Sequence, residues 1–269
     1  GEGEPQGDAA YEEFLKNLSL HRISAIGIIQ GTVDSKTTQR IERGQVPVVW
    51  NQPGTVRSRF AVGNDYAEVV REGTRYLLER GCRRIAWLGW MDPRGSNQDR
   101  DPSYKAFKAT LKQLEAPVRD EWIQGDLHPT LTGAGYEEFR EIWTSREEKP
   151  DGLLVTDDVL FQDVVTAILE LRIAVPDQLQ VVAMANKGMV TCPFFPAMRM
   201  EFDPDEQAEA MGNMLATLAR EETVFSRQIK IPFRWVEERL PNVECRLVRR
   251  SLGVGGMPNE RQESVASDQ

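Results

Sequence analysis

The stretch Asp151-Gly-Leu-Leu-Val-Thr-Asp-Asp158 decides the fold, together with the apolar run up to Leu171 and the segment Leu179-Gln-Val-Val-Ala-Met-Ala185. These segments read as strand, helix and strand, because short apolar runs flank a longer run of helical length. Asp157 and Asp158 stand where the first strand hands over to the helix. Ligands of open α/β sheets bind outside the carboxyl ends of the strands. The sequence therefore predicts two acidic side chains where a polar ligand could be held.

Charge and composition are those of an ordinary globular protein. The 269 residues are 40% hydrophobic and 28% charged, which suits one large or two medium domains. The net charge is -9, and a strongly acidic surface repels nucleic acid, so the bulk charge does not predict that this chain itself grips DNA. No apolar run reaches the length of a membrane span, and the first residues lack a signal-peptide pattern. We therefore expect no membrane partner.

The cysteines and histidines indicate neither a disulfide framework nor a chemical centre. Cys82, Cys192 and Cys245 are odd in number and far apart, which favours a reducing compartment and hence a cytoplasmic protein. No cysteine has a cysteine or histidine neighbour at metal-binding spacing. A glycine-rich phosphate loop and a nucleophile with its base are likewise not recognisable. We expect no metal site and no cofactor, and we do not expect an enzyme.

Strands and helices alternate along the chain. Strands are expected at 23–29, 46–50, 59–63, 84–90 and 122–127, and helices at 66–80, 103–115 and 133–144. A further helix starts at Asp203, with Pro204 in its first position and Glu206 placed to reach back to the cap. Two β runs, 229–238 and 244–250, close the chain. This alternation predicts right-handed βαβ units and mostly parallel sheets in two similar α/β lobes.

Several of these segments resemble the effector-binding domain of the lactose-repressor (LacI/GalR) family of bacterial transcription regulators. The stretch 151–185 is similar to the family's strand ending in Asn-Asp, its helix, its Val-Pro-Asp turn and its following strand. Further resemblances lie, in the family's order and spacing, at Pro47-Val-Val49, Val62-Gly-Asn-Asp65, Arg83-Arg-Ile-Ala-Trp-Leu-Gly89, Arg100-Asp-Pro-Ser-Tyr104 and Arg246-Leu-Val-Arg-Arg-Ser251. Together they cover most of residues 11–252.

The resemblance implies a periplasmic-binding-protein-like type I fold. Two doubly wound parallel-sheet lobes are joined by three crossovers, and a small-molecule effector lies in the cleft between them; we expect a carbohydrate. We expect the first lobe to comprise 11–90 and 201–225, and the second to comprise 91–200 and 226–252. The segments 1–10 and 253–269 are too polar to repay the entropy of ordering and are expected to be disordered.

The chain departs from the family pattern at several places. The family's helix-turn-helix module, and the first strand and helix of its first lobe, have no counterpart here. Tyr66 stands at a usual Asn, Cys82 at a usual His and Ser103 at a usual Gly. Ala183-Met-Ala185 replaces Gly-Phe-Asp, which removes a carboxylate that the family often aims at its ligand. We expect a retuned pocket, a homodimer, and DNA contact only through a helix-turn-helix module not present in this chain.

Four charged residues are the first candidates for ligand binding. The match to the family's Arg motif implies that Arg100 holds the ligand with its five donors; a salt bridge in an Asp-rich loop is the alternative. Asp158 accepts hydrogen bonds from ligand hydroxyls, or it caps the helix that follows. Asp65 has the same two interpretations at the start of the helix at 66–80. Asp157 stands at the family's Asn and is a further candidate.

Three more residues complete the predicted site. Asn186 is next to the position of the lost carboxylate, and His128 is beside the position of a family aromatic residue. Trp90 comes late enough after its strand to line the mouth of the cleft. Trp87, by contrast, is expected to be a packing residue, and His21 an ordinary polar side chain.

Three functions remain open at this stage. The first is the ligand-sensing module of a transcription regulator, and the second is a stand-alone solute-binding protein of the same fold. An upstream helix-turn-helix would favour the first, and a signal peptide would favour the second. A doubly wound enzyme is the third and is disfavoured by the scarcity of histidine and the lack of a nucleophile constellation.

Overall fold

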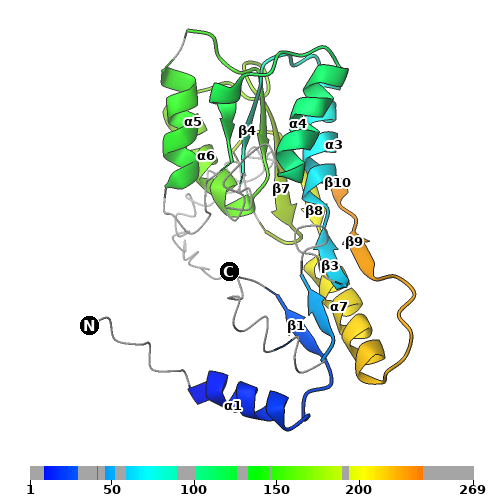
Figure 1. The fold of residues 1–269 in the computed structure, drawn as a ribbon. Coiled ribbons are helices and arrows are strands. Elements are labelled where there is room, and N and C mark those ends of the chain that lie inside the picture. Colours follow the sequence, from blue (N-terminus) through cyan, green and yellow to red (C-terminus); the bar gives the residue numbers. More distant parts are fainter. Residues whose placement is uncertain are drawn as a thin grey trace, which may run out of the picture.

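The computed structural model describes residues 9–29, 41, 46–51, 59–89, 101–125, 133–145, 147–189 and 194–238. These residues form two β-sheets, one above the other in Figure 1, with helices packed along them. The predicted fold class, an α/β fold with parallel sheets, is confirmed. Among the described residues, no helix has the length and apolar character needed to cross a membrane.

The smaller sheet has four strands in the order β1-β2-β3-β9, and all neighbouring strands are parallel. Its strands are β1 (Ile26–Ile28), β2 (Val48–Trp50), β3 (Phe60–Asn64) and β9 (Gln228–Ile231). Helix α7 (Pro204–Ala219) packs across these strands and buries Met211 and Met214. Gly27 allows this close packing, because a Cβ atom there would lie 3.0 Å from Met211 Cε.

The larger sheet has six strands in the order β10-β8-β7-β6-β4-β5, and β10 is the one that runs antiparallel to its neighbour. The strands are β4 (Ile85–Leu88), β5 (Ile123–Gln124), β6 (Gly152–Val155), β7 (Gln180–Asn186), β8 (Ala197–Phe202) and β10 (Arg234–Glu238). A 3-10 turn, η2 (Asp120–Trp122), precedes β5.

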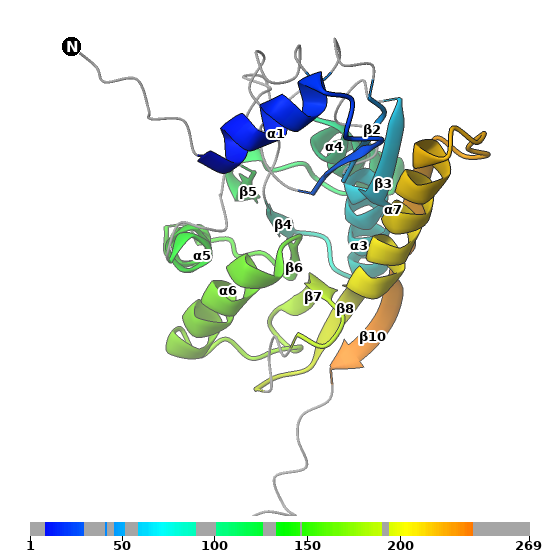
Figure 2. The ribbon, with the colours of Figure 1, turned by 90° about the horizontal axis from the view of Figure 1, so that it is seen from below.

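Helices cover both faces of the six-stranded sheet. Helices α3 (Tyr66–Glu79) and α4 (Pro102–Gln113) lie on one side, and α5 (Ala134–Thr144) and α6 (Asp158–Glu170) lie on the other (Figures 1 and 2). The side chains of β6 alternate accordingly: Leu154 joins the core under α3 and α4, whereas Leu153 and Val155 join the core under α5 and α6. This two-sided covering is the doubly wound arrangement.

The predicted strand–helix–strand unit at 151–185 is present as β6, α6 and β7. Other expected elements also occur at about their expected positions, from β1 to α5 and at α7. Two elements were not predicted. Helix α1 (Ala9–Ser19) includes Ala9 and Ala10, which the sequence had placed in a disordered segment. Strand β8 was missed as well, although Ala197, Met200 and Phe202 are buried.

The predicted lobe boundaries do not match the strand pairing. The sequence placed 84–90 in the first lobe, but β4 pairs with β5 and β6 in the six-stranded sheet, and the preceding helix α3 packs there too. The β8 segment ends at Phe202 in the same sheet, so only α7 of the stretch 201–225 packs on the smaller one. The expected β run 229–238 is two strands in two sheets, because Pro232 has no N–H to continue a ladder.

The chain therefore passes between the sheets three times, as the family resemblance implied. The crossovers follow β3, follow β8 and separate β9 from β10. At the second crossover Asp203 caps α7, accepting a bond from Asp205 N at 3.1 Å, and Pro204 occupies the first turn as predicted. Glu206, however, pairs with Arg234 of β10. The segments 244–250 and 253–269 lie outside the described residues.

Candidate functional site

From the strand order of the six-stranded sheet, a ligand crevice is expected at the ends of β4 and β6. From β4 the chain first adds β5 on one side and then β6 on the other, which makes this a topological switch point. Gly89 and Thr156 follow the two strands and touch: a Cβ on Gly89 would lie 2.0 Å from Thr156 Oγ1. Trp87 is buried and donates from Nε1 to the same hydroxyl at 3.1 Å. Trp87 is thus a packing residue, as expected.

Asp157 and Asp158 have different structural roles at the end of β6. Asp157 is the cap of α6, and its Oδ1 accepts hydrogen bonds from Val159 N at 2.9 Å and Leu160 N at 3.0 Å. Asp158 is 7% exposed, and its Oδ2 accepts from Asn186 N at 3.3 Å and from Asn186 Nδ2 at 2.9 Å. The capping role considered for Asp158 therefore falls to Asp157, while Asp158 ties α6 to the end of β7.

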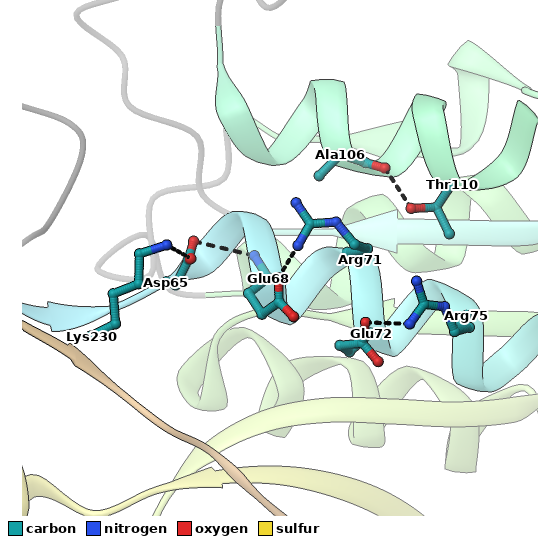
Figure 3. A network of polar contacts seen from close by, with 8 residues as sticks. All are labelled: Asp65, Glu68, Arg71, Glu72, Arg75, Ala106, Thr110 and Lys230. Atoms are coloured by element: carbon teal, nitrogen blue, oxygen red, sulfur yellow. Dashed lines mark hydrogen bonds and ion pairs between the residues drawn. The ribbon is translucent and has the colours of Figure 1, made fainter. Parts of the chain in front are cut away.

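Asp65 lies at the first crossover, between β3 and α3. Its Oδ1 accepts from Glu68 N at 3.3 Å and so caps α3, and its Oδ2 pairs with Lys230 of β9 (Figure 3). Figure 3 also shows that Asp65 begins a row of polar contacts along α3, which continues through the Glu68–Arg71 pair. Both oxygens of Asp65 thus have partners within the chain.

Tyr66 directly follows Asp65, and its phenol is affected by the charges of Asp157 and Asp158. The sequence did not single it out as a site residue. Burial raises the pKa of the Tyr66 phenol, the charges of Asp157 and Asp158 raise it further, and a hydrogen bond with the Asn64 side chain lowers it. The phenol therefore stays neutral and can donate or accept a hydrogen bond. One signal in the sequence could have identified this residue. Tyr66 stands directly after Asp65, at a position where the resembled family has asparagine.

The structure brings four of the predicted residues to one end of the sheets. Asp157 and Asp158 follow β6, and Asn186 ends β7 and binds Asp158. Asp65 directly precedes Tyr66, and the charges of Asp157 and Asp158 act on the Tyr66 phenol. The other three predicted residues, Arg100, His128 and Trp90, lie outside the described residues. Among the residues that the structure describes, no group of three His, Cys, Asp or Glu side chains is arranged to hold a metal ion.

A cavity of about 760 Å³ lies at the opposite end of the four-stranded sheet. It is formed at the amino ends of β2, β3 and β9 and at the end of α7, and His21, Arg59, Phe60 and Arg227 are among its lining residues. No predicted site residue lines it. His21, expected to be an ordinary polar side chain, faces this cavity rather than the crevice.

Cys82 is the one cysteine within the described residues, and it is a buried, unpaired thiol. Its Sγ donates to Asp151 O at 3.4 Å. Burial raises the pKa of this thiol to about 11, and the nearby Asp151 carboxylate raises it too. A neutral buried thiol packs in the core and does not act as a nucleophile at neutral pH.

Known proteins with similar sequences are transcriptional repressors. The chain is 27% identical over 248 residues to the HTH-type transcriptional repressor PurR of Serratia proteamaculans, covering 90% of this chain and 67% of that protein. It is 29% identical over 199 residues to the PurR repressor of Yersinia pestis, covering 72% of this chain and 56% of that one. The chain thus spans between about half and two thirds of the length of these relatives. The expectation that it is not an enzyme is confirmed by them.

Solved structures share the fold. A LacI-type transcriptional regulator from Bacillus cereus subsp. cytotoxis has a TM-score of 0.67 at 18% identity, over 89% of this chain and 83% of that one. The transcriptional regulator CelR in complex with cellobiose has a TM-score of 0.65 at 17% identity, over 86% and 70%. A LacI family regulator from Lactobacillus casei with bound sucrose gives 0.65 at 17%, over 89% and 87%.

The family model described as a periplasmic binding protein-like domain matches residues 74–239, more than half of the chain. The match includes the six strands of the larger sheet, the second and third crossovers and α7. The resemblance to the effector-binding domain of LacI/GalR regulators is thereby confirmed. This chain belongs to the periplasmic-binding-protein-like domain family.

Proposed function

We propose that this chain senses a sugar or another small polar metabolite for a LacI-type transcription regulator, with the effector bound in the crevice between the two sheets. The observation that carries the proposal is the bond between Asp158 and Asn186, beside Asp157, at the carboxyl ends of β6 and β7, next to a topological switch point. The charges of Asp157 and Asp158 also act on the Tyr66 phenol. The proposed site is completed by Asp65 and by Arg100, Trp90 and His128 beyond the described residues.

The chemistry of these side chains suits a ligand with several hydroxyl groups. A carboxylate has about four acceptor positions, and the two bonds from Asn186 to Asp158 both use Oδ2. Asp158 therefore keeps capacity for ligand hydroxyls, and the Tyr66 phenol can donate or accept. A buried hydroxyl without a partner costs about 1–3 kcal/mol, so such a crevice discriminates against ligands that leave it unpaired. The CelR complex with cellobiose and the L. casei regulator with sucrose provide further support.

The proposed regulator is a cytoplasmic homodimer that reads DNA through a helix-turn-helix module outside this chain. Ligand contacts made from both sides of the crevice exist together only when the crevice is closed, so ligand shifts the population toward closure. Light scattering should give the mass of a dimer, and small-angle scattering should give a smaller radius of gyration with saturating ligand. The mass of a monomer would contradict the proposed dimer. An unchanged radius of gyration with a bound sugar would contradict the proposed closure.

Thermal melting with individual sugars tests the binding proposal. Cellobiose, sucrose and a panel of monosaccharides are added to the purified chain, and a bound sugar should raise the melting temperature by mass action. Asp158→Ala should remove most of that rise. Arg220→Gln is the matched control, because Arg220 pairs with Glu222 at the far end of α7. The proposal fails if no sugar raises the melting temperature, or if Asp158→Ala responds like the control.

A further inference from the structure

The first turn of α7 is a junction between the two sheets. The body of α7 packs on the four-stranded sheet, whereas its cap residue Asp203 directly follows β8 of the six-stranded sheet. Two N–H groups of the turn bond to this cap: Asp205 N to Asp203 Oδ1 at 3.1 Å, and Gln207 N to Asp203 O at 3.2 Å. Any force on Asp203 therefore acts on the end of the helix that covers the smaller sheet.

Lys187 directly follows β7 of the larger sheet, and its side chain contacts this cap. Its backbone N donates to Phe202 O at 2.7 Å, and its Nζ donates to Asp203 Oδ2 at 2.5 Å. The hydrogen bond from Lys187 holds the pKa of the Asp203 carboxyl below its usual value. Since half of the Lys187 side chain is exposed, water screens the pair, and its main effect is to fix position.

Two hydrogen bonds brace the turn that contains Lys187. Met189 N donates to Asn186 O at 3.1 Å and closes the turn, and Arg199 Nη1 of β8 donates to Met189 O at 2.8 Å. Asn186 and Lys187 are consecutive residues in this braced turn. A displacement of Asn186 therefore moves Lys187 with it.

Asn186 is bonded to Asp158 in the candidate site, so a short covalent and hydrogen-bonded route leads from that site to α7. We propose that Lys187 is a positioning residue that couples the effector crevice to the first turn of α7, and through α7 to the four-stranded sheet. The proposal rests on the proposed function, since the crevice is taken as the effector site. An effector that engages Asp158 or Asn186 would shift Lys187 relative to Asp203, and Asp203 would carry the shift into the helix.

A second ion pair joins the same turn to the larger sheet, and it does not begin at the site. Glu206 of α7 pairs with Arg234 of β10, which follows the third crossover. This pair braces the turn, whereas the Lys187–Asp203 pair starts next to a residue bonded to Asp158. The route through Lys187 is therefore the one that senses the crevice.

The test measures coupling without needing a ligand. Asn186→Ala removes the side-chain bond to Asp158 from an exposed position, and Asp158→Ala is a second way to break the same bond. Amide exchange at Asp205 and Gln207, followed by NMR in the whole chain, reports the state of the cap. We expect Asn186→Ala to speed this exchange by about threefold or more.

The same comparison is then made in three backgrounds. In Lys187→Met the effect of Asn186→Ala on exchange should fall below about twofold, because the route is cut. In Lys187→Arg, which keeps the cation, and in Arg220→Gln, a control at the other end of α7, the full effect should remain. A purely structural role for Lys187 would change exchange in Lys187→Met alone and leave the response to Asn186→Ala intact.

Two results would overturn the coupling: an unchanged response in Lys187→Met, or no response to either crevice variant in the parent chain. A failure of the proposed coupling can be distinguished from a failure of the sugar-binding proposal. If sugars bind while these variants leave α7 unaffected, the effector proposal stands and the coupling is wrong. If the coupling is measured while no sugar binds, the route through Lys187 stands and the effector class is wrong.

Discussion

The six-stranded and four-stranded sheets are built from parallel strands, apart from the antiparallel β10 of the larger sheet, but they bury these strands to different degrees. All residues of β4 and β6 are buried, whereas Val49 is the one buried residue of β1 and β2. Helices cover both faces of the larger sheet, while α7 packs across the smaller one. The sequences of strands that are covered on both faces are nearly continuous runs of apolar residues. The comparison teaches that Asp157 and Asp158 follow a strand of the better buried of the two sheets, whose packing can hold them in place.

A matched pair of isoleucine substitutions should show the largest difference between the sheets. Ile85 of β4 is 2% exposed, whereas Ile28 of β1 is partly exposed. We expect Ile85→Ala to cost about 2–5 kcal/mol in the free energy of unfolding, as for other buried Ile-to-Ala changes, and Ile28→Ala to cost less than half as much. Urea denaturation of both variants measures this. Equal losses would mean that the two sheets are buried alike.

The next effect concerns ligand binding by Arg100. Arg100→Ala should abolish the thermal stabilisation given by a bound sugar and leave the melting temperature without sugar nearly unchanged. The reason is that a guanidinium offers five donors in a fixed fork, which alanine cannot replace. If Arg100→Ala keeps the sugar-induced rise in melting temperature, Arg100 does not belong to the site.

The loss of folding stability at acid pH should depend on the Lys187–Asp203 ion pair at the junction between the sheets. Lys187 holds the pKa of Asp203 below its usual value of 3.8. A lowered folded-state pKa gives stability that is fully present above the unfolded value and is lost as the pH falls through the folded value. Asp203→Asn should therefore flatten the loss of stability below pH 3.8, as followed by urea midpoints on acidification. A wild-type slope in Asp203→Asn would contradict this.

The smallest expected effect is on DNA. This chain carries a net charge of -9, and specific DNA readers present basic side chains to phosphates and a helix to the groove. We expect no salt-sensitive, sequence-specific binding in fluorescence anisotropy titrations, for either the parent chain or its sheet variants. Nanomolar, salt-dependent binding to any operator sequence would show that one of the sheets or its helices reads DNA itself.

Much of the larger sheet could be predicted because its signals are local. The run 152–155 is apolar, and the two carboxylates Asp157 and Asp158 come directly after Thr156, so the strand end was visible in the sequence. Strand β8 was missed because polar Arg199 and Glu201 interrupt its apolar residues, and these two side chains pair with each other within the strand. Strict alternation of apolar and polar residues over such a length is itself typical of a half-buried strand, so β8 could have been predicted from the sequence.

The candidate site could be predicted in part. Asp157, Asp158 and Asn186 follow predicted strands, and strand ends meet at one edge of a parallel sheet. Tyr66 escaped prediction because a tyrosine at a helix start has no local signature of a site; the charges of Asp157 and Asp158 act on it only because the fold brings distant parts of the chain together. Lys187 escaped for the same reason, since its partner Asp203 is brought near by the pairing of β7 with β8.

The sequence by itself determined the class of the fold, the order of most strands and helices, the cap at Asp203, and the end of the larger sheet at which carboxylates gather. These features depend on neighbours along the chain: apolar period, cap chemistry and the position of proline. Tertiary structure alone decided which sheet each strand joins, that Pro232 separates two sheets, and that Asp158 binds Asn186 while Asp157 caps the helix. Those outcomes depend on pairing and burial between residues distant in sequence, which no local pattern encodes.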